Sequence, residues 1–146
     1  MSDGLHDISI CPMQEQDLPE VLAIENASYP RPWSRTHFLD ELASPHAFPL
    51  SAFDHDGRLV GYICPMQLLD EGHILNVAVH PDCRGRGIGE LLVQRVLGDC
   101  RLGDADFVSI PSHLTSKEYA AKLIPSPGSS ISLWGFHAGL LTFVEG

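Results

Sequence analysis

The sequence has no long apolar run and no segment that reads as a targeting signal. None of its apolar stretches approaches the roughly 20 residues that a membrane-spanning helix needs. The N-terminus, MSDGLHDISICP, lacks the basic segment followed by an apolar segment that marks a signal peptide. We therefore expect no membrane partner and a cytoplasmic location.

Closely spaced cysteines are also missing. The four cysteines are far apart and form no Cys-x-x-Cys pair, and the eight histidines are scattered along the chain. This spacing argues for reduced thiols rather than a disulfide framework or a zinc site, so we expect no bound metal. The cysteines are Cys11, Cys64, Cys83 and Cys100.

Basic residues are few. The chain has 9 Lys and Arg against 19 Asp and Glu, a formal net charge of -10. A protein of this charge repels phosphate backbones, which makes nucleic acid an improbable partner. An acidic surface suits cationic substrates such as amines, although solubility alone also explains it.

The chain of 146 residues predicts a single domain over 1–146, without repeats, low-complexity tracts or linkers. Apolar periodicity predicts three helices. The first covers 15–28, the second follows an N-cap at Ser34, and the third begins at Ile88. The turn Leu69–Gly72 is expected to lead into a strand over 74–79. Further strands are predicted over 8–13, 48–53, 59–69, 106–110, 131–134 and 140–144. This order predicts a mixed α/β fold, with antiparallel hairpins first and a parallel strand later.

The chain is organised around the stretch from Ile74 to Arg101. Residues 74–79 are almost continuously apolar, which suits a strand buried on both faces. A turn-rich loop follows, and from Ile88 the apolar period becomes helical. The glycines of this loop therefore lie where a buried strand passes into a helix N-terminus.

A loop in that position can bind phosphate. The first turn of a helix has unpaired N–H groups and a partial positive charge, and glycines let a ligand approach the backbone. Arg84 and Arg86 add two charges, and in so acidic a chain we expect both to serve a local anion. A lone Gly-x-Gly with two solvated arginines would be an ordinary turn. The strand before it and the helix after it favour the phosphate site.

The loop Arg84-Gly85-Arg86-Gly87-Ile88-Gly89 resembles the R/Q-x-x-G-x-G/A signature of the GNAT acyl-CoA-dependent N-acetyltransferases. Residues 32–34 (Pro-Trp-Ser), 69–71 (Leu-Asp-Glu), 76–79 (Asn-Val-Ala-Val) and 81–82 (Pro-Asp) resemble the RimI-like branch. Its members acetylate the N-terminal alanine of a ribosomal protein. The resemblance covers residues 8–110.

The resemblance implies a GNAT fold: a mixed sheet flanked by helices, whose strands splay apart to admit the pantetheine of acetyl-CoA. The main chain at Val77 and Val79 would pair with the pantetheine amides, and the loop N–H groups would hold the pyrophosphate. The segment of the first two helices would form one wall of the acceptor groove, with Tyr29 and Trp33 as substrate-binding candidates; packing alone is an equal alternative for both. The cofactor-binding residues implied are Val77, Ala78, Val79, Arg84, Gly85, Arg86, Gly87, Ile88 and Gly89.

The implied activity is an acyltransferase that acetylates a protein N-terminal α-amino group, by direct attack of the amine on the acetyl-CoA thioester. Such transfer needs a deprotonated amine, donors to the carbonyl and a proton for the departing thiolate. The family's glutamate base would fall on Pro111 and its tyrosine acid on Leu123. A cofactor-contacting asparagine would fall on Ser116. Residues 111–146 are therefore atypical.

Three other residues are candidates for the missing base and acid. Glu118 and Tyr119 are adjacent, so on a helix they point about 100° apart and are more simply exposed polar residues. Glu71, just before the cofactor strand, could reach the cleft through water, but a turn residue is the simpler interpretation.

The tail has two explanations. It is either a variation of the fold or the product of a reading-frame change near codon 111, which the coding DNA would decide. The missing base and acid leave two alternatives to protein N-terminal acetylation. One is an acetyl-CoA-binding protein with little or no catalysis, and the other is a transferase acting on a small amine.

Overall fold

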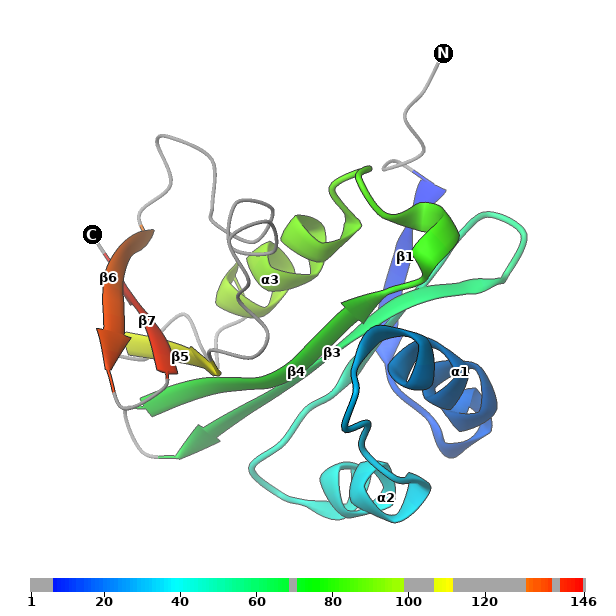
Figure 1. Ribbon diagram of the computed structural model, residues 1–146, viewed down its shortest axis with the longest axis horizontal. Coiled ribbons are helices and arrows are strands. Elements are labelled where there is room, and N and C mark those ends of the chain that lie inside the picture. Colours follow the sequence, from blue (N-terminus) through cyan, green and yellow to red (C-terminus); the bar gives the residue numbers. More distant parts are fainter. Residues whose placement is uncertain (1–6, 69–70, 99–106, 112–130, 138–139, 146) are drawn as a thin grey trace.

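The computed structural model describes residues 7–68, 71–98, 107–111, 131–137 and 140–145. Its strands form a seven-stranded sheet in the order β1-β2-β3-β4-β5-β7-β6 (Figure 1). The strands are β1 (Ser9–Pro12), β2 (Leu50–Phe53), β3 (Leu59–Leu68), β4 (Glu71–Val79), β5 (Phe107–Pro111), β6 (Ile131–His137) and β7 (Leu140–Glu145). The predicted mixed α/β class is confirmed: β5 runs parallel to β4, and every other neighbouring pair is antiparallel.

Helices cover both faces of the sheet. Figure 1 shows α1 (Leu18–Ser28) and α2 (Arg35–Ala43) on one face and α3 (Ile88–Gly98) on the other. Two single turns, η2 (Glu15–Asp17) and η3 (Pro81–Cys83), lead into α1 and out of β4. The predicted N-cap of α2 is confirmed, because the Ser34 hydroxyl accepts a hydrogen bond from the His37 N–H at 3.2 Å.

The core has two parts, one on each face. Beneath α3, apolar side chains of β3 and β4 pack against Ile88, Leu92 and Val96. Beneath α1 and α2, the opposite side of the same strands packs against Leu18 and Phe38. The buried positions of α1 and α3 recur at helical spacing, as the sequence predicts.

Gly61 of β3 brings α3 close to the sheet. A Cβ at this position would lie 3.0 Å from the Ala78 carbonyl oxygen and 3.3 Å from Leu92 Cδ1. The absence of a side chain therefore lets the first turns of α3 approach the strand. This contact fixes the helix N-terminus beside the end of β4.

β4 is paired very differently on its two edges. On one edge it pairs with β3 along its whole length, from Glu71 to Val79. On the other it pairs with β5 only over residues 71–73, opposite residues 107–109. The two parallel strands therefore separate after His73, which agrees with the splayed sheet that the resemblance implies.

One boundary expected from the sequence is wrong. Glu71 and Gly72 were expected in a turn, but both belong to β4, where Glu71 pairs with Leu68 across the hairpin. The strand extends further because Glu71 also pairs with Phe107 of β5, a partner distant in the sequence. The expected burial of residues 74–79 on both faces is confirmed, with Ile74, Val77 and Ala78 fully buried.

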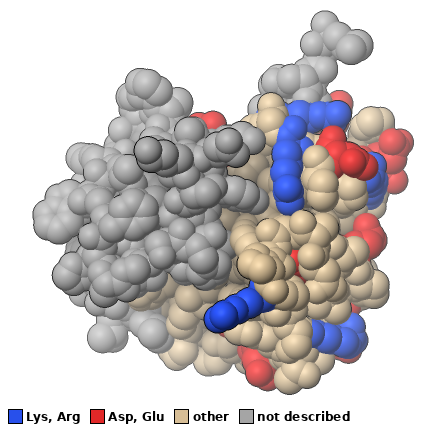
Figure 2. Space-filling view, viewed as in Figure 1, with Lys and Arg blue, Asp and Glu red and all other residues tan. Residues whose placement is uncertain are grey.

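Basic side chains are dispersed on the surface. In Figure 2, the Lys and Arg side chains on the described part of the visible face stand in separate groups, most with acidic neighbours. Within the described residues of this face they form no continuous basic band.

Candidate functional site

The open edge of β4 presents main-chain groups of alternate residues. The His80 N–H donates to the Val60 carbonyl at 2.8 Å, which makes these two residues a hydrogen-bonded pair of the antiparallel ladder. In such a ladder every second pair exchanges no hydrogen bonds, and the register places Val77 and Val79 in those pairs. Their N–H and C=O groups therefore point away from β3, towards the side where β5 has separated.

Side chains of the protein contact both of the outward carbonyls. The Tyr29 hydroxyl, just after α1, donates to the Val77 carbonyl. The Arg84 Nε donates to the Val79 carbonyl at 3.0 Å, and its Nη2 donates to the Ser28 hydroxyl at 2.8 Å. The C-terminal end of α1, the open edge of β4 and the following loop are thus tied together.

This result divides the roles of the two arginines. The sequence assigned both Arg84 and Arg86 to a ligand anion. The structure gives the Arg84 guanidinium two partners within the chain, so part of its function is to brace the loop. Arg86 is exposed, two residues before the first turn of α3. Arg84 is exposed as well, but of the two arginines it is the one that makes side-chain hydrogen bonds to described residues.

The loop geometry fits a phosphate group. Gly85 and Gly87 have φ values of 82° and 85°, in the left-handed region that favours glycine. The Gly87 carbonyl accepts the Leu91 N–H at 2.9 Å, which starts α3. The N–H groups of the first turn of α3, which begins at Ile88, have no acceptors within the helix. A Cβ at Gly85 would have no atom within 4 Å, so this side of the loop is open to a ligand.

A buried carboxylate lies behind β4, on the face covered by α1. Glu25 is only 1% exposed. Its Oε1 accepts from the Tyr62 hydroxyl at 2.5 Å and from Asn76 Nδ2 at 2.7 Å, and its Oε2 accepts from the Trp33 N–H at 2.9 Å. The three donors come from β3, β4 and the connection between α1 and α2.

The surroundings of Glu25 are strongly desolvated. Burial raises the pKa of the Tyr62 hydroxyl well above its ordinary value, and the neighbouring Glu25 carboxylate raises that pKa further. Asn76 Oδ1 is buried and has no hydrogen-bond partner among the described residues. Tyr62 and Asn76 therefore serve Glu25 as donors inside the protein, away from solvent.

Sequence reasoning missed the Glu25 cluster, although a signal was present. Glu25 follows Leu18 by seven residues and Val21 by four, so it lies on the buried face of α1. A carboxylate at such a position requires buried donors. Asn76 belongs to the Asn-Val-Ala-Val motif at 76–79, but spacing alone does not identify its partner on α1.

The two aromatic wall candidates differ in their environments. Tyr29 contacts the open edge of β4 through its hydroxyl. Trp33 is half-buried and stacks on His37, with ring centroids 3.8 Å apart and planes 8° apart. It also packs at a tilt against Phe38. Trp33 thus has a clear packing role, whereas Tyr29 contacts the open edge of β4.

The catalytic candidates are not brought together in the described part of the chain. Glu71 is the first residue of β4, six residues before Val77 and at the end of the strand far from the glycine loop. Glu118 and Tyr119 lie outside the described residues. Pro111, where the family's glutamate would fall, is the last residue of β5 and pairs with Leu140 of β7.

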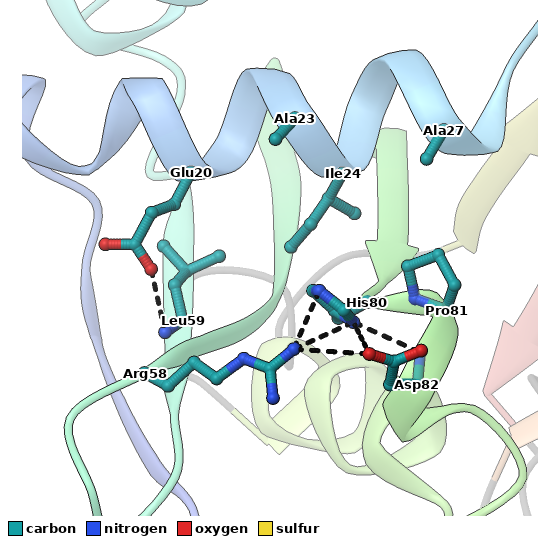
Figure 3. A pocket seen from close by; sticks show the side chains of 9 residues that line it. All are labelled: Glu20, Ala23, Ile24, Ala27, Arg58, Leu59, His80, Pro81 and Asp82. Carbon is teal, nitrogen blue, oxygen red and sulfur yellow. Dashed lines mark hydrogen bonds and ion pairs between the residues drawn. The ribbon is translucent and has the colours of Figure 1, made fainter.

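A surface cavity of about 370 Å³ lies elsewhere, between α1, the start of β3 and η3 (Figure 3). Arg58 forms one side of it through a 2.9 Å contact with His80 and a 3.5 Å ion pair with Asp82. Its lining includes the apolar side chains of Ile24 on α1 and Pro81 on η3. None of the residues assigned to cofactor or substrate lines this cavity.

Features of other protein classes are missing from the described residues. They include no group of three or more His, Cys, Asp and Glu side chains arranged to hold a metal ion. Cys11, Cys64 and Cys83 have free thiols. No helix among the described residues is both long and apolar enough to cross a membrane.

Comparison with known proteins identifies the family. Residues 18–123 match the family model described as Acetyltransferase (GNAT) family, so the matched region continues past residue 110, where the recognisable motifs end. A Bacillus subtilis protein provisionally named a ribosomal protein bS18-alanine N-acetyltransferase is 33% identical over 99 residues. That match covers 67% of this chain and 65% of the relative.

Solved structures agree on the fold. The ribosomal-protein-S18-alanine N-acetyltransferase of Escherichia coli superimposes with a TM-score of 0.70 at 20% identity, covering 93% of this chain and 91% of the other. The PaiA N-acetyltransferase of Thermoplasma acidophilum, solved in complex with coenzyme A, gives 0.68 at 15% identity, with 98% of each chain covered. The GNAT fold expected from the loop motif is confirmed. With a family model matched over more than half of its length, this chain belongs to the Acetyltransferase (GNAT) family.

Proposed function

We propose that the protein is an acetyl-CoA-dependent N-acetyltransferase, formed by one GNAT domain over residues 1–146, that acetylates a protein N-terminal α-amino group. The observation that carries this proposal is the open edge of β4. The outward main-chain groups of Val77 and Val79 lead directly into the loop Arg84–Gly89 at the N-terminus of α3. The naming of the Bacillus relative supports the choice of acceptor.

Acetyl-CoA, when bound, supplies an activated acetyl group as a thioester. Val77, Ala78 and Val79 would align it along β4, and Gly85, Gly87, Ile88 and Gly89 would present main-chain N–H groups to its pyrophosphate. Arg86 would add positive charge, and Arg84 would hold the loop in place through Val79 and Ser28. Tyr29 and Trp33 would form the wall along which the acceptor amine approaches.

The amine is proposed to attack the thioester directly, without an acyl-enzyme. Cys83 is only 7% exposed and packs in the core beneath α3, which leaves its sulfur unsuited to a covalent role. Replacing it with alanine should therefore leave turnover nearly unchanged. Ping-pong kinetics, or loss of activity in Cys83→Ala, would overturn direct attack.

A second function has its own supporting observation. Pro111 stands where the family's glutamate would fall, and a proline has no ionisable group. This favours an acetyl-CoA-binding protein with little or no catalysis. A small-amine acceptor is a further alternative, because the wall at Tyr29 and Trp33 does not exclude one.

Two measurements test these alternatives. Calorimetry would measure acetyl-CoA binding to the wild type and to the Arg84→Ala, Arg86→Ala double variant, where we expect about a tenfold weaker affinity, roughly 1.4 kcal/mol. Thiol release would then be followed with alanine-initiated peptides and with a panel of small amines. Binding without release from any acceptor would establish the non-catalytic alternative, and absence of binding would reject all three functions.

A further inference from the structure

We infer that Glu25 is a positioning residue that holds the acceptor wall against the cofactor strand through the Trp33 N–H and the Asn76 side chain. This inference rests on the proposed function and adds a residue that neither the motifs nor the comparisons assign. The same carboxylate bonds to the Tyr62 hydroxyl, so one side chain links four elements: α1, the α1–α2 connection, β3 and β4.

The burial and the number of donors exclude a direct chemical role. The side chain is 1% exposed, and its two oxygens accept three hydrogen bonds of 2.5–2.9 Å. A general base needs an oxygen within reach of the substrate amine, and Glu25 has neither oxygen exposed. Its influence on the reaction must therefore pass through the groups that it holds.

Those groups border the proposed site. Asn76 immediately precedes Val77, whose carbonyl points to the open edge of β4. Trp33 lies four residues after Tyr29, whose hydroxyl contacts that same carbonyl, and the Tyr29 N–H donates to the Glu25 main-chain carbonyl at 3.1 Å. The Tyr29 bond is a main-chain bond of α1, whereas the Glu25 side chain holds the Trp33 end of the segment 29–33 and, through Asn76, the strand beside it.

A buried carboxylate is a costly way to stabilise a core, since apolar residues of similar size are often as good or better. A carboxylate differs from an apolar residue because its hydrogen bonds are directional. The two oxygens of Glu25 fix the positions of three donors at once. Loss of this link should let the wall move relative to β4, which lowers the affinity of an acceptor bound between them. Acetyl-CoA held by β4 and the α3 loop should be much less affected.

The test compares Glu25→Gln with Glu20→Gln in the full chain. Glu20 is on the same helix and accepts the Leu59 N–H at 3.1 Å. Among the described residues it has no bond to β4 or to Trp33, so the control carries the same substitution outside the link. In Glu25→Gln the side-chain NH₂ group must face either the Trp33 N–H or the donors on Tyr62 and Asn76. Either orientation leaves one side of the link without its acceptor, so exchange of the Trp33 N–H or of the Asn76 side-chain NH₂ should be about tenfold faster in Glu25→Gln, and both should be unchanged in Glu20→Gln.

Kinetics then separate positioning from stability, at a temperature where both variants are folded. We expect the KM of an alanine-initiated peptide to rise by about tenfold in Glu25→Gln, while the KM of acetyl-CoA and kcat stay within about threefold. A fall in kcat alone would indicate a smaller folded fraction and overturn the inference. Unchanged exchange at both the Trp33 N–H and the Asn76 side-chain NH₂ would overturn it as well.

Failure of the proposed function has a different signature. If the wild type binds acetyl-CoA but acetylates no acceptor, the acetyltransferase proposal fails. The positioning role is then judged by whether a non-reactive alanine-initiated peptide binds more weakly to Glu25→Gln than to Glu20→Gln in the presence of coenzyme A. Equal peptide affinities, or no peptide binding to the wild type, would overturn it.

Discussion

The hydroxyl of Tyr29 donates a hydrogen bond to the main-chain carbonyl of Val77. Forty-eight residues separate the two in sequence, and the contact joins the end of α1 to the open edge of β4. The carbonyl is one of the two that the proposed function assigns to pantetheine. Tyr29 is therefore a partner of β4 at the position where the proposed function places the ligand.

Tyr29→Phe removes this hydrogen bond and keeps the ring. We expect the free energy of unfolding to fall by about 1 kcal/mol, the usual net contribution of one hydrogen bond. Urea denaturation would measure this change. Since the variant leaves the Val77 carbonyl available, acetyl-CoA should bind to it within about twofold of the wild type or more tightly. Binding weakened by about tenfold or more would show that the hydroxyl itself contacts the ligand.

Single substitutions at Arg84 and Arg86 should behave differently. Arg84→Ala loses bonds to the Val79 carbonyl and the Ser28 hydroxyl, so thermal stability should fall by about 1–2 kcal/mol. Arg86→Ala, at an exposed position, should leave the melting temperature unchanged and weaken acetyl-CoA by about fivefold to tenfold. High salt should reduce the effect of Arg86→Ala on binding. Equal losses of stability in the two variants would contradict this division.

Glu41 gives a pH-dependent prediction. Burial raises the pKa of its carboxyl above the ordinary 4.5, with Asp40 adding to the rise and His37 opposing it. The folded state therefore binds this proton more tightly than the unfolded chain. Protonated Glu41 therefore contributes to the free energy of unfolding at pH values below the pKa of this carboxyl in the unfolded chain. That contribution is lost as the pH rises through the higher pKa of the folded state.

Glu41→Gln should accordingly melt at a higher temperature than the wild type at neutral pH, and this difference should shrink below about pH 4. Its position in the last turn of α2 acts in the same direction, because a negative charge is unfavourable at a helix C-terminus. Melting curves recorded across the pH range would measure both effects. A variant that melts below the wild type at neutral pH would contradict the prediction.

Gly61→Ala should destabilise the fold by about 1–3 kcal/mol, because the added methyl group would press on the Ala78 carbonyl and on Leu92. Gly57→Asn provides the control. Gly57 has a φ of 79° with no atom near its Cβ position, and asparagine tolerates this conformation. Its free energy of unfolding should change by less than about 0.5 kcal/mol. A similar loss in both variants would contradict the packing role of Gly61.

The strand–loop–helix unit could be predicted from the sequence because its signals are local. The apolar run 74–79, the glycines at 85 and 87 and the period that begins at Ile88 each specify their own segment. The cap at Ser34 is equally local. The start of β4 was predicted wrongly because its first residues are fixed by β5, more than thirty residues later.

The Glu25 cluster shows the same limit at the level of side chains. Helical periodicity alone would place Glu25 on the buried face of α1, but its donors lie 8, 37 and 51 residues away. Pairings at such separations depend on how the sheet and the helices assemble. No spacing rule in one sequence specifies them.

The register between β3 and β4 has a consequence for the whole site. The ladder shifts once, between Cys64 and Pro65, before residues 76–79 are reached. A slip of one residue would exchange the odd and even positions of β4. Val77 and Val79 would then turn their carbonyls to β3, and Asn76 would leave Glu25 for the face of α3. The open edge of β4 and the donors of Glu25 thus depend on a single parity, which the register of the β3–β4 hairpin sets.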